Sequence, residues 1–317
     1  MDKFGWCILG TGSITFKVAP ELLKNENSYI VSCWNRTHEK AVLFSNKFGG
    51  TAYENIDECL KRDDIDCVYV AVTNDVHYKF ALKAIEYGKN VLLEKPFTIN
   101  KKETIDLINK AKENNVYLSE AMWTWYNDTA IKTKENISKI GNIKSAKLTF
   151  GFPIKSLSKK GRLWDIERGG GALLDLGVYP IRYAYELFGM PKSIEATASL
   201  YKGIDKYDEI IFKYDNFVCI IKTCIDRIVS EYVYVKGEKG EIKVPFFHQA
   251  HKTILKTEKK QIFKYKGLLY QKQFKVVEDE IKSGLSESNY LTHKSTIDVM
   301  ELLDKIRNII GVKYPQD

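Results

Sequence analysis

The sequence predicts an α/β protein of two domains, in which a doubly wound parallel sheet is followed by an α+β domain with an open, mostly antiparallel sheet. Three observations support this fold class. The chain has 317 residues, beyond the size at which one hydrophobic core usually keeps growing. Strand and helix patterns alternate through roughly the first 120 residues, whereas closely spaced β-rich runs occupy residues 193–266. We therefore expect domains at residues 1–122 and 123–317.

The first domain is predicted from apolar runs that alternate with helical patterns. After its first residue, an aspartate, the run DCVYVAV is apolar, which is typical of a strand covered on both faces. The helical pattern HEKAVLFSNKFG ends in glycine, a common helix terminator. In chain order, the expected strands are 4–10, 28–35, 66–72, 90–95 and 116–123, and the expected helices are 14–25, 38–49, 77–88 and 101–115.

The second domain follows a different pattern. A helical stretch at about 127–139 begins it, and an amphipathic helix at 295–311 ends it. Between them, short turn signals separate runs such as DEIIFKY and FVCIIKTCI, which favours a largely antiparallel sheet. The lysine-rich segment 252–275 is interpreted as exposed strands rather than a nucleic-acid surface.

The stretch GGGALLDLGVYPI, residues 169–181, is unlike an ordinary core helix. Glycine inside a helix costs roughly 1 kcal/mol relative to alanine, yet three glycines open this segment. If residues 172–181 are helical, Asp175 and Tyr179 lie one turn apart on one face, with a bend at Pro180. We interpret the glycines as leaving room for a substrate or nicotinamide.

Composition and charge narrow the class of protein. The net charge of +8 arises from 49 basic and 41 acidic residues, but the lysines are scattered and no nucleic-acid-binding motif accompanies them. A solvated lysine-rich surface, or a field suited to a small anionic ligand, explains the charge better. The six cysteines form no CxxC pair, no apolar run approaches the length of a bilayer span, and the N-terminus lacks the pattern of a signal peptide. We expect a cytoplasmic protein with no membrane or nucleic-acid partner.

A phosphate-binding loop is predicted where the first strand meets the first helix. In GTGSIT, residues 10–15, Gly10 permits a tight turn and Gly12 lets the backbone approach a phosphate, while the helix N-terminus offers free N–H groups. Thr15 stands where a third glycine is usual. The loop, with Thr11, Ser13 and Ile14, indicates a Rossmann domain that binds NAD or NADP.

The residues after the second strand favour NADP over NAD, although NAD stays possible. An acidic residue at this place would bind the ribose 2′-hydroxyl of NAD. The sequence instead has Asn35 and Arg36, followed by Thr37 and His38 at the start of a helix. Arginine suits a 2′-phosphate; the alternative is that Arg36 simply faces solvent.

Two further strand ends carry candidate cofactor residues. TNDVH follows one buried strand and supplies Thr73, Asn74 and His77, although Asn74 also suits a helix cap. LLEKPF ends the next strand and supplies Glu94 and Lys95. These strand ends lie at the carboxyl edge of a parallel sheet, where such folds bind ligands.

The motifs GTGSIT, TNDVH, EKP and GGGALLDLGVYPI, in this order, resemble those of the Gfo/Idh/MocA oxidoreductases. The resemblance covers essentially the whole chain. EAMW at 120–123, together with Tyr179, looks most like the NADP-dependent branch that contains dihydrodiol and D-xylose dehydrogenases.

The resemblance implies hydride transfer between NADP(H) and a hydroxyl or carbonyl group of a sugar, cyclitol or diol. Tyr179 is then the acid/base group, and Lys95 supplies the ammonium that lowers the pKa of about 10 usual for a phenol. Asp175 orients the substrate or Lys95. Relatives of this kind often associate through the open face of the second sheet, so we expect a homodimer or a higher homo-oligomer.

The sequence departs from the nearest branch after EAMW. Trp125 stands where arginine is typical and Asp128 where proline is common, so the identity of the substrate does not transfer from these relatives. A stretch before the glycines borders the same expected cleft. The candidate substrate residues are Trp123, Trp125, Arg162, Trp164 and Arg168.

Other interpretations have less support. His248 and His251 have a spacing that suggests a metal pair, but no nearby cysteine or carboxylate completes a ligand set, so no metal is expected. A non-catalytic NADP-binding regulator of the same fold is the main rival function. Retention of both Lys95 and Tyr179 favours an enzyme, because a sensor needs neither.

Overall fold

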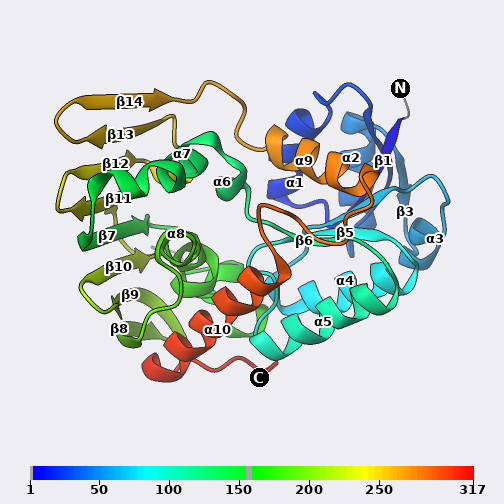
Figure 1. Ribbon diagram of the computed structural model, residues 1–317. Coiled ribbons are helices and arrows are strands. Elements are labelled where there is room, and N and C mark those ends of the chain that lie inside the picture. Colours follow the sequence, from blue (N-terminus) through cyan, green and yellow to red (C-terminus); the bar gives the residue numbers. More distant parts are fainter. Residues whose placement is uncertain (1–2, 155–158) are drawn as a thin grey trace. The chain divides into compact units, whose positions relative to one another are not determined.

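The computed structural model describes residues 3–154 and 159–317, and the chain divides into two compact units (Figure 1). The first unit comprises Met1–Trp123 with Leu268–Thr296, and the second comprises Thr124–Gly267 with Ile297–Asp317. Residues 268–296, expected in the second domain, therefore belong to the first unit.

Six parallel strands form the sheet of the first unit, in the order β3-β2-β1-β4-β5-β6. This order confirms the predicted doubly wound sheet. The very short β3 and α3 were not expected. The strands are β1 (Phe4–Leu9), β2 (Ser28–Trp34), β3 (Thr51–Tyr53), β4 (Cys67–Val70), β5 (Asn90–Glu94) and β6 (Leu118–Ala121), and the helices are α1 (Ser13–Leu22), α2 (His38–Phe48), α3 (Ile56–Leu60), η1 (Asn74–Val76), α4 (His77–Glu86), α5 (Lys101–Glu113) and α9 (Gln271–Lys282).

Helix α9 completes the core of the first unit. The ring of Phe274 packs edge-on against those of Trp6 and Tyr69, at centroid distances of 5.3 and 5.4 Å. Trp6 Nε1 also donates a hydrogen bond of 3.0 Å to Glu278 Oε1. The expectation of exposed strands is therefore wrong for residues 271–275, which are helical. The lysines lie on the outer face of this helix, and they made the segment look exposed although its other face is buried.

Eight strands form the sheet of the second unit, in the order β14-β13-β12-β11-β7-β10-β9-β8. Every pair is antiparallel except β7 with β10, which confirms a mostly antiparallel sheet. No strand was expected at the position of the central β7. The strands are β7 (Ile143–Gly151), β8 (Ser193–Tyr201), β9 (Ile204–Lys213), β10 (Val218–Cys224), β11 (Val229–Gly237), β12 (Glu241–Pro245), β13 (Lys252–Lys256) and β14 (Lys260–Lys264).

Apart from α9, the helical segments of the chain from residue 123 onward are mostly short. They are α6 (Trp123–Tyr126), α7 (Asp128–Asn136), η2 (Ile137–Ile140), η3 (Arg162–Trp164), η4 (Ile166–Arg168), η5 (Leu173–Gly177), α8 (Val178–Phe188), η6 (Phe247–Gln249) and α10 (His293–Ile310). Among the described residues, no helix combines the length and the hydropathy that crossing a membrane requires.

The segment expected to be helical at 172–181 is helical, but it begins as a π-helical turn, η5, and continues as α8. Pro180 provides no N–H for the carbonyl of Leu176, where an α-helix would need one. The π-helical turn, η5, lies directly before this missing hydrogen bond. Turns of this kind are rare and frequently occur at functional sites.

Candidate functional site

The first glycine turn lies at the carboxyl edge of the parallel sheet, after β1. Gly10 has φ +95°, a conformation that favours glycine, and its N–H donates to Trp34 O over 2.8 Å. A Cβ at Gly10 would lie 2.5 Å from the carbonyl oxygen of Ala71, just after β4. The turn therefore sits between β1 and β4, where the strand order reverses and doubly wound sheets bind ligands.

The turn opens at its second glycine. No atom of the described residues lies within 4 Å of the position that a Cβ of Gly12 would take, and Gly12 begins α1 without a side-chain cap. The buried hydroxyl of Thr11 has no hydrogen-bond partner among the described residues. Thr15 donates its own hydroxyl back to Gly12 O over 2.8 Å. This turn fits the diphosphate of a dinucleotide for three reasons: its backbone is open, its hydroxyl is unsatisfied, and the helix that starts at Ser13 and Ile14 has an uncapped N-terminus.

The residues expected to select NADP connect β2 to α2. Asn35 Oδ1 accepts a hydrogen bond of 2.9 Å from the backbone N–H of Thr37, which fixes the turn. Arg36 between them is exposed, and Thr37 begins α2 without a side-chain cap. A guanidinium beside the positive end of a helix provides the charge that a 2′-phosphate would need.

The segment after β4 is held by a buried histidine. The His77 ring is only 1% exposed and lies 2.8 Å from Pro96 O through Nδ1 and 3.3 Å from Val72 O through Nε2. It therefore joins the segments that follow β4 and β5. Thr73 and the buried Asn74 lie in the same connection, at the start of η1.

Lys95 follows β5 at the same edge of the sheet. It is half-buried and forms a cis peptide bond with Pro96. Its backbone N–H donates to Glu94 Oε2 over 3.2 Å, and the buried Glu94 also accepts a hydrogen bond from the hydroxyl of Tyr69. The peptide that carries Lys95 is thus fixed by a carboxylate of its own strand.

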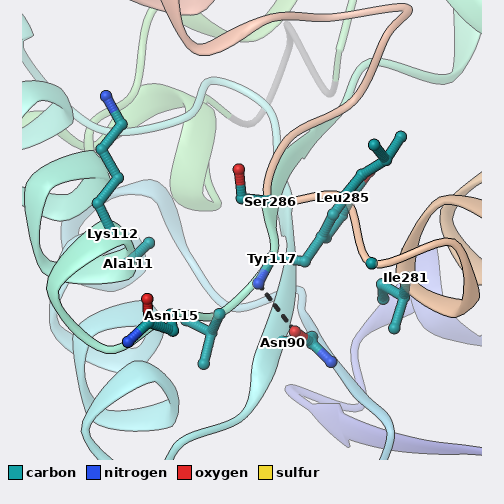
Figure 2. Close-up of a pocket in the computed structure, with 10 residues that line it drawn as sticks. Asn90, Ala111, Lys112, Asn115, Tyr117, Ile281, Leu285 and Ser286 are labelled. Atoms are coloured by element: carbon teal, nitrogen blue, oxygen red, sulfur yellow. Dashed lines mark hydrogen bonds between the residues drawn. The ribbon is translucent and has the colours of Figure 1, made fainter.

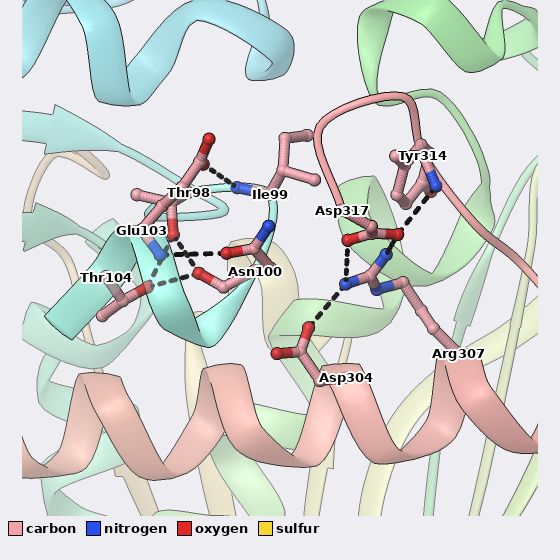
Figure 3. A network of polar contacts seen from close by, with 9 residues as sticks. All are labelled: Thr98, Ile99, Asn100, Glu103, Thr104, Asp304, Arg307, Tyr314 and Asp317. Atoms are coloured by element: carbon pink, nitrogen blue, oxygen red, sulfur yellow. Dashed lines mark hydrogen bonds and ion pairs between the residues drawn. The ribbon is translucent and has the colours of Figure 1, made fainter. Parts of the chain in front are cut away.

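The backbone beyond Lys95 is fixed as well, by the N-terminus of α5 (Figure 3). Asn100 Oδ1 accepts from the backbone N–H of Glu103 over 2.9 Å, and Glu103 Oε2 accepts from that of Ile99 over 3.2 Å. Thr98 donates its hydroxyl to Asn100 O over 2.7 Å. Reciprocal caps of this kind stabilise the start of a helix.

The second glycine turn, in the second unit, is filled by the protein itself. A Cβ at Gly170 would lie 2.6 Å from Arg162 O, and a Cβ at Gly171, where φ is +119°, would overlap Asp205 Oδ1. The interpretation that these glycines leave room for a substrate or nicotinamide is therefore wrong for Gly170 and Gly171. They let their own backbone approach neighbouring protein atoms.

Asp175 lies in the π-helical turn and is paired with a candidate substrate residue. Arg162 Nη2 donates to Asp175 Oδ1 over 2.8 Å. The Asp175 side chain is 7% exposed and that of Arg162 39% exposed, so the pair reaches from the interior of the second unit to its surface.

Tyr179, at the start of α8, is 4% exposed and packs among aromatic rings. Its ring lies edge-on to Phe150 at 5.8 Å and to His248 at 4.6 Å, and His248 stacks on Phe150 at 4.5 Å. The backbone N–H of His248 donates to Glu231 Oε1 over 2.7 Å. From the sequence, His248 was considered only as half of a metal pair, so its position beside Tyr179 was not predicted.

The remaining candidate residues lie mostly in the interior. Trp125 is 3% exposed and packs edge-on against Tyr183. Trp164 is 7% exposed and donates its indole N–H to Ile154 O over 2.8 Å. Trp123 packs against Tyr270 in the first unit, whereas Arg168 is exposed and lies 3.3 Å from Asp165 in an ion pair.

The structure offers no metal site among the described residues, and it has a pocket away from the glycine turn. No group of three or more His, Cys, Asp or Glu side chains in the described part of the chain has the arrangement of a metal site. A pocket of about 500 Å³ lies in the first unit between Asn90, Lys112, Tyr117 and Leu285 (Figure 2). Because Asn90 begins β5 and Tyr117 directly precedes β6, this pocket lies at the amino edge of the sheet, opposite the glycine turn.

Comparison with known proteins supports the geometry of both units. Residues 4–122 match the family described as an oxidoreductase family with an NAD-binding Rossmann fold. Residues 133–243 match the C-terminal domain of the Gfo/Idh/MocA family. Together these matches cover more than two thirds of the chain.

Curated relatives match almost end to end. A trans-1,2-dihydrobenzene-1,2-diol dehydrogenase from Xenopus laevis is 29% identical, over 99% of this chain and 99% of its own length. An NADP-dependent scyllo-inositol 2-dehydrogenase from Bacillus subtilis is 28% identical, over 98% of each chain.

Solved structures show the same fold. A 3-ketoreductase from Actinomadura kijaniata, in complex with NADP and TDP-benzene, has a TM-score of 0.87 and 20% identity, with 98% of each chain covered. An aldose-aldose oxidoreductase from Caulobacter crescentus has a TM-score of 0.87 and 19% identity, again with 98% of each chain covered. Two family matches in tandem and full-length relatives confirm the resemblance of the motifs: the chain belongs to the Gfo/Idh/MocA oxidoreductase family.

Proposed function

We propose that this oxidoreductase transfers a hydride between NADP(H) and a hydroxyl or carbonyl group of a sugar, cyclitol or diol. The observation that carries the proposal is the open glycine turn before α1, with its uncapped helix N-terminus and unsatisfied Thr11 hydroxyl. The full-length relatives named as diol and inositol dehydrogenases support the substrate class.

NADP is the proposed cofactor, and its nicotinamide supplies or accepts the hydride when bound. The exposed Arg36 and the uncapped start of α2 support a contact with the 2′-phosphate. Gly10, Gly12 and Thr11 hold the diphosphate in this proposal. Lysine or arginine at such a place attracts a phosphate more strongly than it attracts a hydroxyl.

We propose Tyr179 as the acid/base group and Lys95 as the cation that assists it. An alcohol gives up hydride only as its hydroxyl proton leaves, so a base must accept that proton. An ammonium favours the phenolate form of tyrosine over the phenol. In the reverse direction Tyr179 donates the proton. The burial of Tyr179 against Phe150 and His248 supports a ring held in one orientation.

Asp175 and Arg162 form the proposed substrate-orienting pair. Their 2.8 Å contact holds the Asp175 carboxylate in the π-helical turn, and the Arg162 side chain as a whole is 39% exposed. The N–H groups of a guanidinium are donors that suit the hydroxyl groups of a polyol.

A homodimer in the cytoplasm completes the proposal. Along β9, buried Ile210 and Phe212 alternate with half-exposed Ile211 and Lys213, so one face of the strand is only partly covered. A second copy of the chain would cover this face. The six cysteines are free and buried, in keeping with a reducing compartment.

The test is nicotinamide absorbance over time, with NADP and NAD each offered against aldoses, inositols and vicinal diols. Tyr179→Phe should lower kcat at least about 100-fold, since a positioned acid/base group contributes about 10²–10⁴-fold. Tyr183→Phe is the matched control, because Tyr183 is buried one turn later and donates its hydroxyl to Thr133 Oγ1 over 3.2 Å.

Three outcomes distinguish the proposed enzyme and the role of Tyr179 from the non-catalytic regulator. Turnover with NADP that collapses only in Tyr179→Phe supports the enzyme and the role of Tyr179. Equal turnover in Tyr179→Phe and Tyr183→Phe removes that role. Tight NADP binding without turnover across the panel, in either direction, favours the non-catalytic regulator.

A further inference from the structure

Two aspartates lie on the buried face of β9, at a spacing that a regular strand would not allow. Asp205 and Asp208 are three residues apart, and side chains at odd spacing normally point to opposite faces. The pairing of β8 with β9 shifts between Ser199 and Leu200, so that Lys206 has no partner in the register. This one-residue bulge turns both carboxyl groups inward, and each residue is 0% exposed.

Asp205 caps the π-helical turn. Its Oδ2 accepts a hydrogen bond of 2.5 Å from the backbone N–H of Leu173, the first residue of η5. Its other oxygen occupies the space that a side chain at position 171 would need, so Gly171 is required for this contact. The carboxylate thus takes the place at a helix N-terminus where an external anion would otherwise bind.

Asp208 has no such donors. Neither of its oxygens, nor Oδ1 of Asp205, has a hydrogen-bond partner among the described residues when both groups are ionised. Two buried carboxylates side by side would also repel each other. One proton on Asp208 removes both problems, because the carboxyl O–H then donates to Asp205.

The electrostatics agree with this assignment. Burial raises the pKa of Asp208 well above its usual value, and the neighbouring charge of Asp205 raises it further. Burial also raises the pKa of Asp205, but the contact with Asp208 and the backbone N–H groups of Leu173 and Ala172 act in the opposite direction. Asp205 is therefore the ionised member and Asp208 the protonated one.

We propose that Asp205 and Asp208 share one proton, and that the pair is a positioning device that holds the π-helical turn carrying Asp175 and leading to Tyr179. The pair carries one negative charge and one proton, with the O–H of Asp208 donating to Asp205. Its effect on catalysis rests on the proposed function; its effect on the turn does not.

The C-terminal segment holds the same turn from a second point. Tyr314 donates its hydroxyl to Gly170 O over 2.6 Å. Arg307, on α10, donates to Asp317 over 2.7 Å, and Asp317 accepts from the backbone N–H of Tyr314 over 2.8 Å (Figure 3). The glycine turn is therefore anchored by a tyrosine on one side and by Asp205 on the other.

Other titratable groups act on the pair and enter its pH dependence. A thiolate at Cys224, on β10, would raise the pKa of Asp208. Burial and the charges of Asp205, Asp208 and Asp317 raise the pKa of Tyr314, and Arg307 lowers it. Burial raises the pKa of Cys224 and that of Tyr314, which favours the neutral thiol and the neutral phenol.

The first test measures protonation directly. Carboxyl ¹³C shifts of the intact chain, followed against pH, should show one aspartate that stays protonated above the ordinary pKa of about 3.9, and Asp208→Asn should remove that signal. Thermal unfolding gives the second measurement. A raised carboxyl pKa stabilises the fold below the ordinary pKa, and this stability is lost as the pH rises through the folded-state pKa of Asp208. Asp208→Asn should flatten that loss.

The second test replaces each aspartate in turn, in order to separate a positioning role from a purely structural one. Asp208→Asn keeps a neutral donor and should leave the hydrogen exchange of the Leu173 amide unchanged. Asp205→Asn removes the charged cap and should speed that exchange; with a substrate in hand it should lower kcat about tenfold to 100-fold, as a displaced group does, with no change in NADP affinity. Asp215→Asn, at an exposed position, is the control.

The outcomes are distinguishable. If Asp208 ionises near the ordinary aspartate value, or if Asp208→Asn and Asp205→Asn change Leu173 exchange equally, the shared proton is overturned whatever the activity. If the exchange results hold and no substrate is turned over, the positioning pair stands and the proposed function fails.

Discussion

The two glycine turns look alike in the sequence but perform opposite tasks in the structure. At the turn before α1, Gly12 faces open space and the helix N-terminus has no side-chain cap. At the turn before the π-helical segment, Gly170 and Gly171 face the protein's own atoms, and Asp205 caps the N-terminus. In our proposals the first turn binds an external anion, and the second holds an internal one. A glycine thus indicates that other atoms come close to the backbone, but not whether those atoms belong to a ligand or to the protein.

The largest effect should come from filling the closed turn. Gly171→Ala places a Cβ on Asp205 Oδ1 and forces alanine to φ +119°. We expect a loss of about 3 kcal/mol or more in the free energy of unfolding, from backbone strain and a displaced buried carboxylate. Denaturant unfolding measures it. An unchanged midpoint would show that Asp205 does not need this glycine.

A smaller effect on stability, but a clear one on binding, should follow from filling the open turn. The Cβ of Gly12→Ala meets no atom within 4 Å in the described part of the chain, and Gly12 has the ordinary φ of −88°. The free energy of unfolding should change by less than about 1 kcal/mol. NADP should bind at least about tenfold more weakly, because a methyl group replaces the space for a phosphate. Fluorescence titration with NADP measures this, and equal affinity in both proteins would contradict the phosphate site.

The smallest effect concerns the unsatisfied hydroxyl of the open turn. Thr11→Val keeps the shape of the side chain and removes a buried oxygen that has no partner in the described residues. We expect the protein without cofactor to gain about 0.5–1 kcal/mol in stability. The added stabilisation by NADP should shrink in the same variant, which thermal unfolding with and without NADP can show. A variant that loses stability without cofactor would contradict an unsatisfied Thr11.

Local patterns were enough to predict most of the parallel sheet of the first unit and the glycine turn before α1, but not β3, α3 or the return of α9. β1 is an apolar run ending in glycine, and Gly10, Thr11 and Gly12 follow it directly, so the motif and its context are adjacent in the chain. The carboxyl-edge positions of Asn74 and Lys95 follow from the same alternation of strand and helix.

What the sequence did not reveal depends on partners far along the chain. β7 pairs with β10 and β11, some 70 to 90 residues later, so nothing in its own pattern marks it as central. Asp205 meets the turn at Leu173 only through a bulge created by strand pairing. His248 reaches Tyr179 by the same kind of long-range approach.

The return of α9 to the first unit has a consequence for the order in which the protein is made. Trp6 and Tyr69 are covered by Phe274, which the ribosome adds some 200 residues after Tyr69. The N-terminal sheet therefore emerges during synthesis with part of its core uncovered. Its core is completed only after most of the second unit has been synthesised. A chain interrupted before residue 268 would expose these rings rather than release an independent dinucleotide-binding domain.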